Sequence, residues 1–121
     1  MKILMSAQGK NKSDLLDTWF GRCPYFQIYD NESKKIKVLE NEGVTASQGA
    51  GIAAAQQVVN EKVEVVISGS IGPNAFRILD GANIKMIKAE EEKIEQIIKD
   101  YEDGKLTQVQ NPGKAHQGMN K

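Results

Sequence analysis

The chain has 121 residues, of which 40% are hydrophobic and 26% are charged, a composition typical of one folded domain and not of a disordered segment. Its 16 basic and 16 acidic residues balance, so the bulk charge gives no sign of a nucleic-acid-binding surface. No apolar run approaches the roughly 20 residues that cross a bilayer, and the first residues lack a signal-peptide core. We therefore expect a cytoplasmic protein that binds neither nucleic acid nor membrane.

Short β-prone segments dominate the first part of the chain. Residues 2–7 form a brief apolar run, and runs of this length favour a buried strand. Residues 8–13 are polar and rich in turn formers, apolar residues return over 15–20, and Gly-Arg-Cys-Pro breaks the chain at 21–24, so we expect an irregular, packed loop over 8–24. Residues 25–29 and 35–39 flank a turn-forming stretch, and their spacing predicts a hairpin of two antiparallel strands.

Helices and strands alternate in the second part. A helix is predicted over 49–61 because its apolar residues recur at helical spacing, and residues 63–68 form a β-branched strand typical of the centre of a sheet. A short helix over 73–81 begins at a proline and ends at a glycine, which suits both ends. A brief strand over 84–87 precedes a helix over 90–103, whose first three residues are glutamates that would interact favourably with the helix dipole.

Together these elements predict an α/β domain. Their order, β-β-β-α-β-α-β-α, indicates a mixed β-sheet with flanking helices, in which an antiparallel hairpin joins a parallel half. We assign residues 1–106 to this domain. Residues 107–121 contain two glycines, one proline and few apolar side chains, so a mobile C-terminal tail is expected there.

The sharpest functional signal is a glycine-bearing loop, residues 68–74, which leads from a predicted central strand directly into the start of a helix. Backbone N–H groups, small hydroxyls and the positive end of a helix dipole all favour a bound anion there. Two glycines at the start of the preceding helix form a second possible cradle of N–H groups. The candidate binding residues in these two places are Ser70, Gly72, Asn74, Gly49 and Gly51. The alternative is a tight turn that needs glycine only for steric reasons.

Cys23 is the only cysteine, which excludes an internal disulfide and any Cys-x-x-Cys metal motif. It follows Arg22, and a neighbouring cation lowers the pKa of a thiol and favours the thiolate that binds soft metals. Cys23 is therefore the candidate metal ligand, and Arg22 is a candidate anion-binding residue. The alternative is that Cys23 is a small buried core side chain, which is the usual role of an isolated cysteine.

The sequence offers few candidates for catalysis. The single histidine, His116, falls in the expected tail, so a preorganised histidine base is not expected. Neither glycine-bearing segment ends in the Gly-Lys-Ser/Thr sequence of a nucleotide-binding P-loop. We therefore expect a binding protein and not an enzyme.

Three ordered motifs resemble the dinitrogenase iron–molybdenum cofactor biosynthesis family, and a fourth stretch near the end agrees with it. They are Phe20–Phe26, Gln48–Gly51, Val66–Phe76 and Glu102–Leu106. The family includes the NifX proteins and the C-terminal domain of NifB, and the resemblance implies a ribonuclease H-like fold. It also implies a role in binding or carrying iron–molybdenum or iron–sulfur precursors between metallocluster assembly proteins.

Gln48 is a departure from the family pattern, because relatives often place a histidine immediately before the Gly-x-Gly motif. An amide oxygen is a poor ligand for a soft iron site. Gln48 stays a candidate binding residue, and Cys23 is left as the one soft ligand. The fold does not imply a nuclease either, because residues 2–7 contain no carboxylate to hold a divalent metal.

Three hypotheses of different classes follow. The first is a non-enzymatic binding or carrier protein for an iron–molybdenum or iron–sulfur metallocluster or its precursor. The second is a protein-interaction or regulatory domain of a cluster-assembly system that binds no metal itself. The third, a small enzyme acting on a phosphate or carboxylate at the same loops, is disfavoured because the sequence offers no general base. We expect metallocluster assembly proteins as partners, and a monomer or a weak homodimer.

Overall fold

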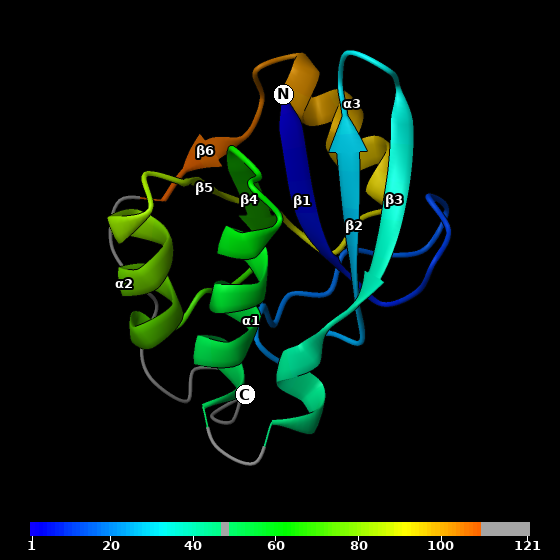
Figure 1. Ribbon diagram of the computed structural model, residues 1–121. Helices are drawn as coiled ribbons and strands as arrows, with labels where there is room; N and C mark the ends of the chain where they lie inside the picture. Colours follow the sequence, from blue (N-terminus) through cyan, green and yellow to red (C-terminus); the bar gives the residue numbers. More distant parts are fainter. Residues whose placement is uncertain (47–48, 110–121) are drawn as a thin grey trace.

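The computed structural model describes residues 1–46 and 49–109, which form a mixed β-sheet with helices on both faces (Figure 1). In chain order the elements are β1 (Lys2–Ala7), β2 (Tyr25–Asp30), β3 (Lys35–Glu40), the 3-10 helix η1 (Glu42–Thr45), α1 (Ala50–Asn60), β4 (Val65–Ser68), α2 (Pro73–Gly81), β5 (Lys85–Lys88), α3 (Ile94–Glu102) and β6 (Thr107–Gln108). This arrangement confirms the predicted α/β fold with a mixed sheet and flanking helices.

The sheet is part parallel and part antiparallel, with the strand order β3-β2-β1-β4-β5-β6. β4 pairs in parallel with both β1 and β5, whereas the β2–β3 hairpin and β6 pair with their neighbours in antiparallel fashion. The carboxyl ends of β1, β4 and β5 therefore meet at one end of the sheet. Both α1 and α2 begin at this end, which is the lower end in Figure 1.

Alternate residues of the strands supply two hydrophobic cores, one on each face of the sheet. Leu4 of β1 packs in a buried cluster with Val58 of α1, whereas its neighbour Met5 packs on the opposite face with Ile97 of α3. This follows from the strand geometry, since successive side chains point to opposite faces. Within the described residues, no helix is both long enough and apolar enough to cross a membrane.

Helix α3 begins at Ile94, later than the start predicted at Glu90. The N–H of Leu16 donates to the carbonyl of Glu92 at 2.8 Å, and the N–H of Ile94 donates to the carbonyl of Asp14 at 2.9 Å. Because this backbone pairs with the loop after β1, it cannot turn into a helix at the same residues. The prediction that glutamates 90–92 form the first turn of this helix is therefore wrong, and Glu95 is the acidic residue of that turn.

The tail predicted from residue 107 is wrong for its first residues. Thr107 and Gln108 form β6 and pair with β5, and the N–H of Val109 donates to the carbonyl of Met86 at 2.8 Å. The Val109 side chain also packs against the core under α1 and α2, and this apolar contact stabilises the pairing of β6. Residues 110–121 lie outside the described part of the chain.

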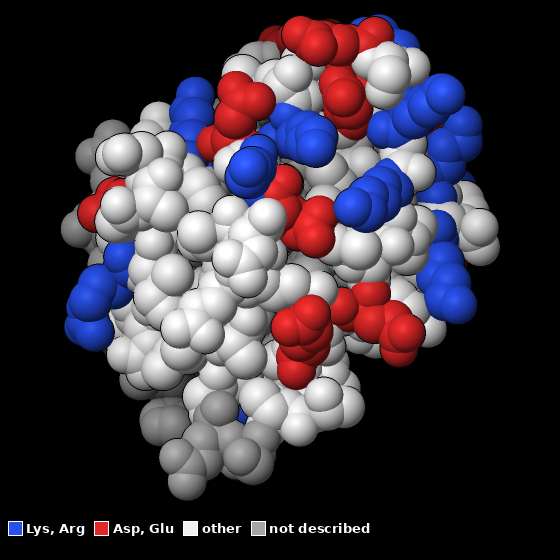
Figure 2. Space-filling view, viewed as in Figure 1, with Lys and Arg blue, Asp and Glu red and all other residues white. Residues whose placement is uncertain are grey.

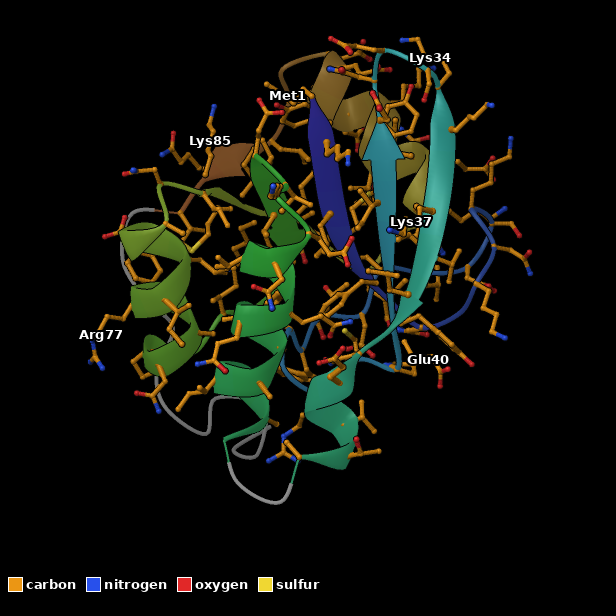
Figure 3. The ribbon with its side chains drawn as sticks, viewed as in Figure 1. Met1, Lys34, Lys37, Glu40, Arg77 and Lys85 are labelled. Atoms are coloured by element: carbon orange, nitrogen blue, oxygen red, sulfur yellow. The ribbon has the colours of Figure 1, made fainter. Side chains whose placement is uncertain are left out.

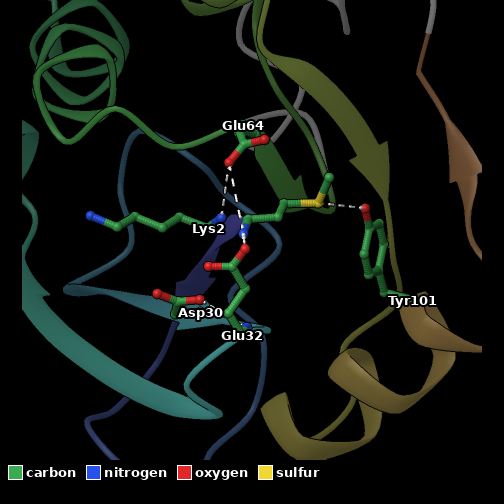
Figure 4. A network of polar contacts seen from close by, with 6 residues as sticks. Lys2, Asp30, Glu32, Glu64 and Tyr101 are labelled. Atoms are coloured by element: carbon green, nitrogen blue, oxygen red, sulfur yellow. Dashed lines mark hydrogen bonds and ion pairs between the residues drawn. The ribbon is translucent and has the colours of Figure 1, made fainter.

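A polar network lies at the other end of the sheet, around the first residue (Figure 4). The Met1 amine lies 4.0 Å from a carboxylate oxygen of Glu32 and 4.0 Å from one of Glu64. The Tyr101 hydroxyl donates to the Met1 sulfur at 3.4 Å. Exposed ion pairs of this kind add little stability, so the two cores and the sheet hold this end together.

We predict that β6 stabilises the domain although it is short. A chain that ends at Leu106 should unfold with a free energy lower by about 1–3 kcal/mol, because the backbone hydrogen bonds to β5 are lost. The matched control ends at Val109 and keeps β6, so the difference between the two truncations in urea denaturation reports residues 107–109 alone. Equal stability of the two chains would contradict this role.

Candidate functional site

The starts of α1 and α2 lie side by side at the carboxyl end of the parallel strands (Figure 1). A Cβ atom placed on Gly51 would lie 3.6 Å from the Cβ of Ala75, so the first turns of the two helices are in contact. Gly49 and Gly72 are the N-cap residues, and neither start has a side-chain cap. The first N–H groups of both helices are therefore not held by a capping side chain. Both helix dipoles favour an anion at this end.

A cavity of about 340 Å³ opens beside the start of α1, and we call it the glycine cavity. Its walls come from three segments, which are the turn after Phe20, the η1 helix and the first residues of α1. The residues that line it are Gly21, Arg22, Gly43, Val44, Ala46, Gly49 and Ala50. Among these described residues Arg22 is the only charged one, and its side chain is exposed.

Two glycines allow the three walls to approach one another. A Cβ atom on Gly43 would collide with the carbonyl oxygen of Ala50, and one on Gly21 would lie only 3.0 Å from the backbone nitrogen of Gly51. Any other residue at Gly43 would therefore displace η1 from α1. Three of the seven lining residues are glycines, which have no side chain to cover their backbone, and exposed backbone N–H groups can bind anions.

The buried side chain of Asn41 fastens two walls of the glycine cavity together. Its amide nitrogen donates to the carbonyl oxygens of Gly21 at 3.2 Å and Cys23 at 2.8 Å. Its amide oxygen accepts the N–H of Gly43 at 2.8 Å. Asn41 thus caps η1 and holds the turn after Phe20 with the same side chain. The sequence reasoning missed this residue, although Asn two residues before Gly is a turn signal.

Gln57 makes a second buried amide link, between α1 and the backbone on either side of Asn41. Its amide nitrogen donates to the carbonyl of Glu40 at 2.8 Å, and its amide oxygen accepts the N–H of Glu42 at 2.9 Å. The helical pattern alone predicts an exposed polar residue here, but Gln57 is buried. Its hydrogen bonds compensate for burying a polar group.

The predicted binding residues fall in different places. Arg22 and Gly49 line the glycine cavity, and Gly51 lies behind it against Gly21. Gly72 caps α2, and Asn74 is exposed in the first turn of that helix. Gln48 and His116 lie outside the described residues.

Ser70 lies in a separate, neighbouring cavity with Thr18 and Trp19. The N–H of Phe20 donates to the carbonyl of Ser70 at 3.2 Å, and Trp19 and Ser70 form a parallel bridge. The segment around Phe20 therefore separates Ser70 from the glycine cavity. The two glycine-bearing segments thus contribute to different cavities, Ser70 to one and Gly49 to the other.

Cys23 is a core residue with no exposed surface. Its thiol donates to the carbonyl of Phe20 at 3.3 Å. Burial, with a smaller contribution from the negative charge of Asp17, raises the pKa of the Cys23 thiol from 9.0 to about 12. The prediction that Arg22 lowers this pKa is wrong, and the alternative of a buried core cysteine agrees with the geometry. Among the described residues, no group of three His, Cys, Asp or Glu side chains is placed to hold a metal ion.

The family described as dinitrogenase iron-molybdenum cofactor matches residues 1–118 of the chain. The chain belongs to this family. The resemblance carried by the three sequence motifs is thereby confirmed. The match to the dinitrogenase iron–molybdenum cofactor family includes all residues of the sheet, its helices and the lining of both cavities.

Similar proteins come from archaea and bacteria. An uncharacterised protein of Methanocaldococcus jannaschii is 33% identical over 94 residues, which are 75% of this chain and 80% of the relative. The apo form of the orange protein from Desulfovibrio gigas is 31% identical, with a TM-score of 0.89 over 93% of this chain and 96% of that one. A protein from Thermotoga described as a NifB protein is 30% identical, with a TM-score of 0.79 over 93% of this chain and 98% of its own.

We predict that the buried thiol of Cys23 makes stability fall at alkaline pH. The unfolded chain loses this proton above about pH 9, whereas the folded chain keeps it to about pH 12. The free energy of unfolding should therefore fall with rising pH, by up to about 1.4 kcal/mol per pH unit. The control is Cys23→Ala, which removes the titrating group. Urea titrations of both proteins from about pH 8 to about pH 10.5 measure the difference, and parallel curves would refute the assignment.

Asn41→Ala should lower the free energy of unfolding by about 2–4 kcal/mol, because it leaves two carbonyls and one N–H without their partner. Amide hydrogen exchange should show the N–H of Gly43 losing protection. Asn60→Ala, at the exposed end of α1, is the matched control and should change stability by much less. If both variants unfold alike, Asn41 does not hold the cavity walls.

Proposed function

We propose that this protein is a non-enzymatic carrier that binds an anionic iron–molybdenum or iron–sulfur cluster, or its precursor, at the glycine cavity and the adjoining helix starts. The observation that carries the proposal is the convergence of two helix starts without side-chain caps beside a cavity lined by Arg22. Membership of the dinitrogenase iron–molybdenum cofactor family supports the class of cargo. A relative described in an apo form supports a bound group in this fold.

Backbone N–H groups and Arg22 would hold the cargo by hydrogen bonds and charge. N–H donors aimed at an anion form charge-assisted hydrogen bonds, which are stronger than neutral ones. Cys23 takes no part in this mode of binding, because its thiol is buried and keeps its proton at neutral pH. Electrostatic retention releases cargo more readily than several metal–thiolate bonds would, and easy release suits delivery to a cluster-assembly partner.

The second candidate is a protein-interaction domain of a cluster-assembly system that binds no metal itself. It is favoured by apolar side chains next to the cavity, since Val44 is 54% exposed and Ile52 is 37% exposed. Helix α1 contains no charged residue, and the surface over it is largely uncharged (Figure 2). A carrier also needs a docking surface, so metal retention and not docking separates the two candidates.

Anaerobic reconstitution with ferrous iron, sulfide and molybdate tests the carrier proposal. After desalting, the wild-type protein should retain metal and the visible absorbance of a cluster. Arg22→Ala should weaken retention about tenfold or more, because one charge-assisted contact is lost.

The chain offers a matched control for this experiment in its only other arginine. Arg77 of α2 points away from the helix starts (Figure 3), and Arg77→Ala changes the net charge by the same amount. Arg77→Ala should therefore bind as the wild type does. If the wild-type protein retains neither iron nor molybdenum, the carrier proposal is wrong and the interaction domain is favoured. Equal losses in both variants would refute the role of Arg22.

A further inference from the structure

A second cavity, of about 260 Å³, lies at the carboxyl ends of β4 and β5, and we call it the switch-point cavity. Its lining residues are Thr18, Trp19, Gly69, Ser70, Lys88, Ala89 and Glu90. They come from the loops that follow β1, β4 and β5 and from Lys88, the last residue of β5. No residue is shared with the lining of the glycine cavity.

The topology of the sheet favours a ligand at this place. From β1 the chain first builds β2 and β3 on one side, and it then returns to build β4, β5 and β6 on the other side. Open α/β sheets bind ligands beyond the carboxyl ends of the strands at such a reversal. Small-molecule cavities usually measure about 300–1,000 Å³, and this cavity of about 260 Å³ is slightly smaller, so it suits a ligand of only a few heavy atoms.

The walls of the switch-point cavity are fixed by hydrogen bonds from the strands. The N–H of Phe20 donates to the carbonyl of Ser70 at 3.2 Å, and the N–H of Ala89 donates to the carbonyl of Ser68 at 3.1 Å. The buried hydroxyl of Ser6 lies 2.8 Å from the hydroxyl of Ser68, which joins β1 to β4 beneath the cavity. Its shape is therefore largely formed before any ligand binds.

Two opposite charges lie in the lining without neutralising each other. Lys88 and Glu90 are both exposed, with the buried Ala89 between them, so they lie on the same side of the chain. Within residues 1–46 and 49–109, neither one forms an ion pair. Trp19 adds a half-buried aromatic surface.

We propose that the switch-point cavity binds a small zwitterion that carries one ammonium and one carboxylate group, as free amino acids do. The ammonium of Lys88 pairs with the ligand carboxylate, and the carboxylate of Glu90 accepts hydrogen bonds from the ligand ammonium. Trp19 packs against the carbon chain between them. Two opposite charges at separate points select against simple anions and simple cations, each of which would satisfy one group only. This site needs no metal and is independent of the proposed carrier function.

Titration of the wild-type protein with glycine, β-alanine and 4-aminobutyrate tests the proposal, since the three probes differ in the distance between their charges. Trp19 is the only tryptophan, so its fluorescence reports on this cavity. At least one probe should give a saturable change at millimolar concentration, together with amide shifts at Ser70 and Ala89. Acetate and methylammonium, which carry one charge each, should bind at least about tenfold more weakly.

Lys88→Ala and Glu90→Gln should each weaken binding of the best zwitterion about tenfold or more, because each removes a charge-assisted contact. Lys85→Ala is the matched control, because Lys85 begins the same strand and lies at the opposite end of the sheet (Figure 3). The proposal is overturned if no zwitterion gives a saturable change, or if acetate binds as tightly and Glu90→Gln has no effect. Molybdate-dependent shifts at Gly21 and Gly43 report the glycine cavity separately.

Discussion

The close approach of three backbone segments at one end of the sheet determines the architecture of both cavities. Gly21 touches the start of α1, and Gly43 brings η1 against the carbonyl of Ala50. Without these contacts the turn after Phe20 could not lie between α1 and the loop after β4. That turn is the wall that the two cavities share, because Phe20 bonds to Ser70 on one side and Gly21 and Arg22 line the other.

Such close packing leaves polar backbone groups without water, and two buried amides compensate for this. Asn41 and Gln57 together bond to five backbone groups of the surrounding segments, two carbonyls and one N–H for Asn41 and one of each for Gln57. A buried unpaired group costs about 1–3 kcal/mol. Because each amide pairs with several such groups, removing it would lower the free energy of unfolding by more than the loss of one hydrogen bond. The shape of the glycine cavity thus depends on side chains that do not face its ligand.

The local pattern of apolar residues predicted most of the fold. Strands that contact a core on each face, and helices that contact one core, place their apolar residues at the spacing that the sequence shows. β1 and α2 have the bounds that were expected from their sequences. The late start of α3 was not predictable, since it depends on pairing with the loop at Asp14. The candidate site was predicted less accurately, because it too depends on tertiary contacts. Whether Ser70 and Gly49 meet, and whether Cys23 is exposed, depends on contacts between residues distant in the chain.

Burial of the only thiol decides which kind of binding site this member of the family can build. A buried, protonated sulfur is not available as a metal ligand, so the binding site that we propose relies on backbone N–H groups, one arginine and two helix starts. Each helix start contributes about 0.3–1 kcal/mol, and each hydrogen bond to a charged group contributes about 1.5–3 kcal/mol. Two helix starts and two or three such bonds sum to about 4–11 kcal/mol, and the freedom lost on association costs at least about 4 kcal/mol of this. The dissociation constant is therefore micromolar or weaker. For the carrier that we propose, affinity in that range would be enough to shield a cargo briefly and low enough for a partner with thiolate ligands to remove it.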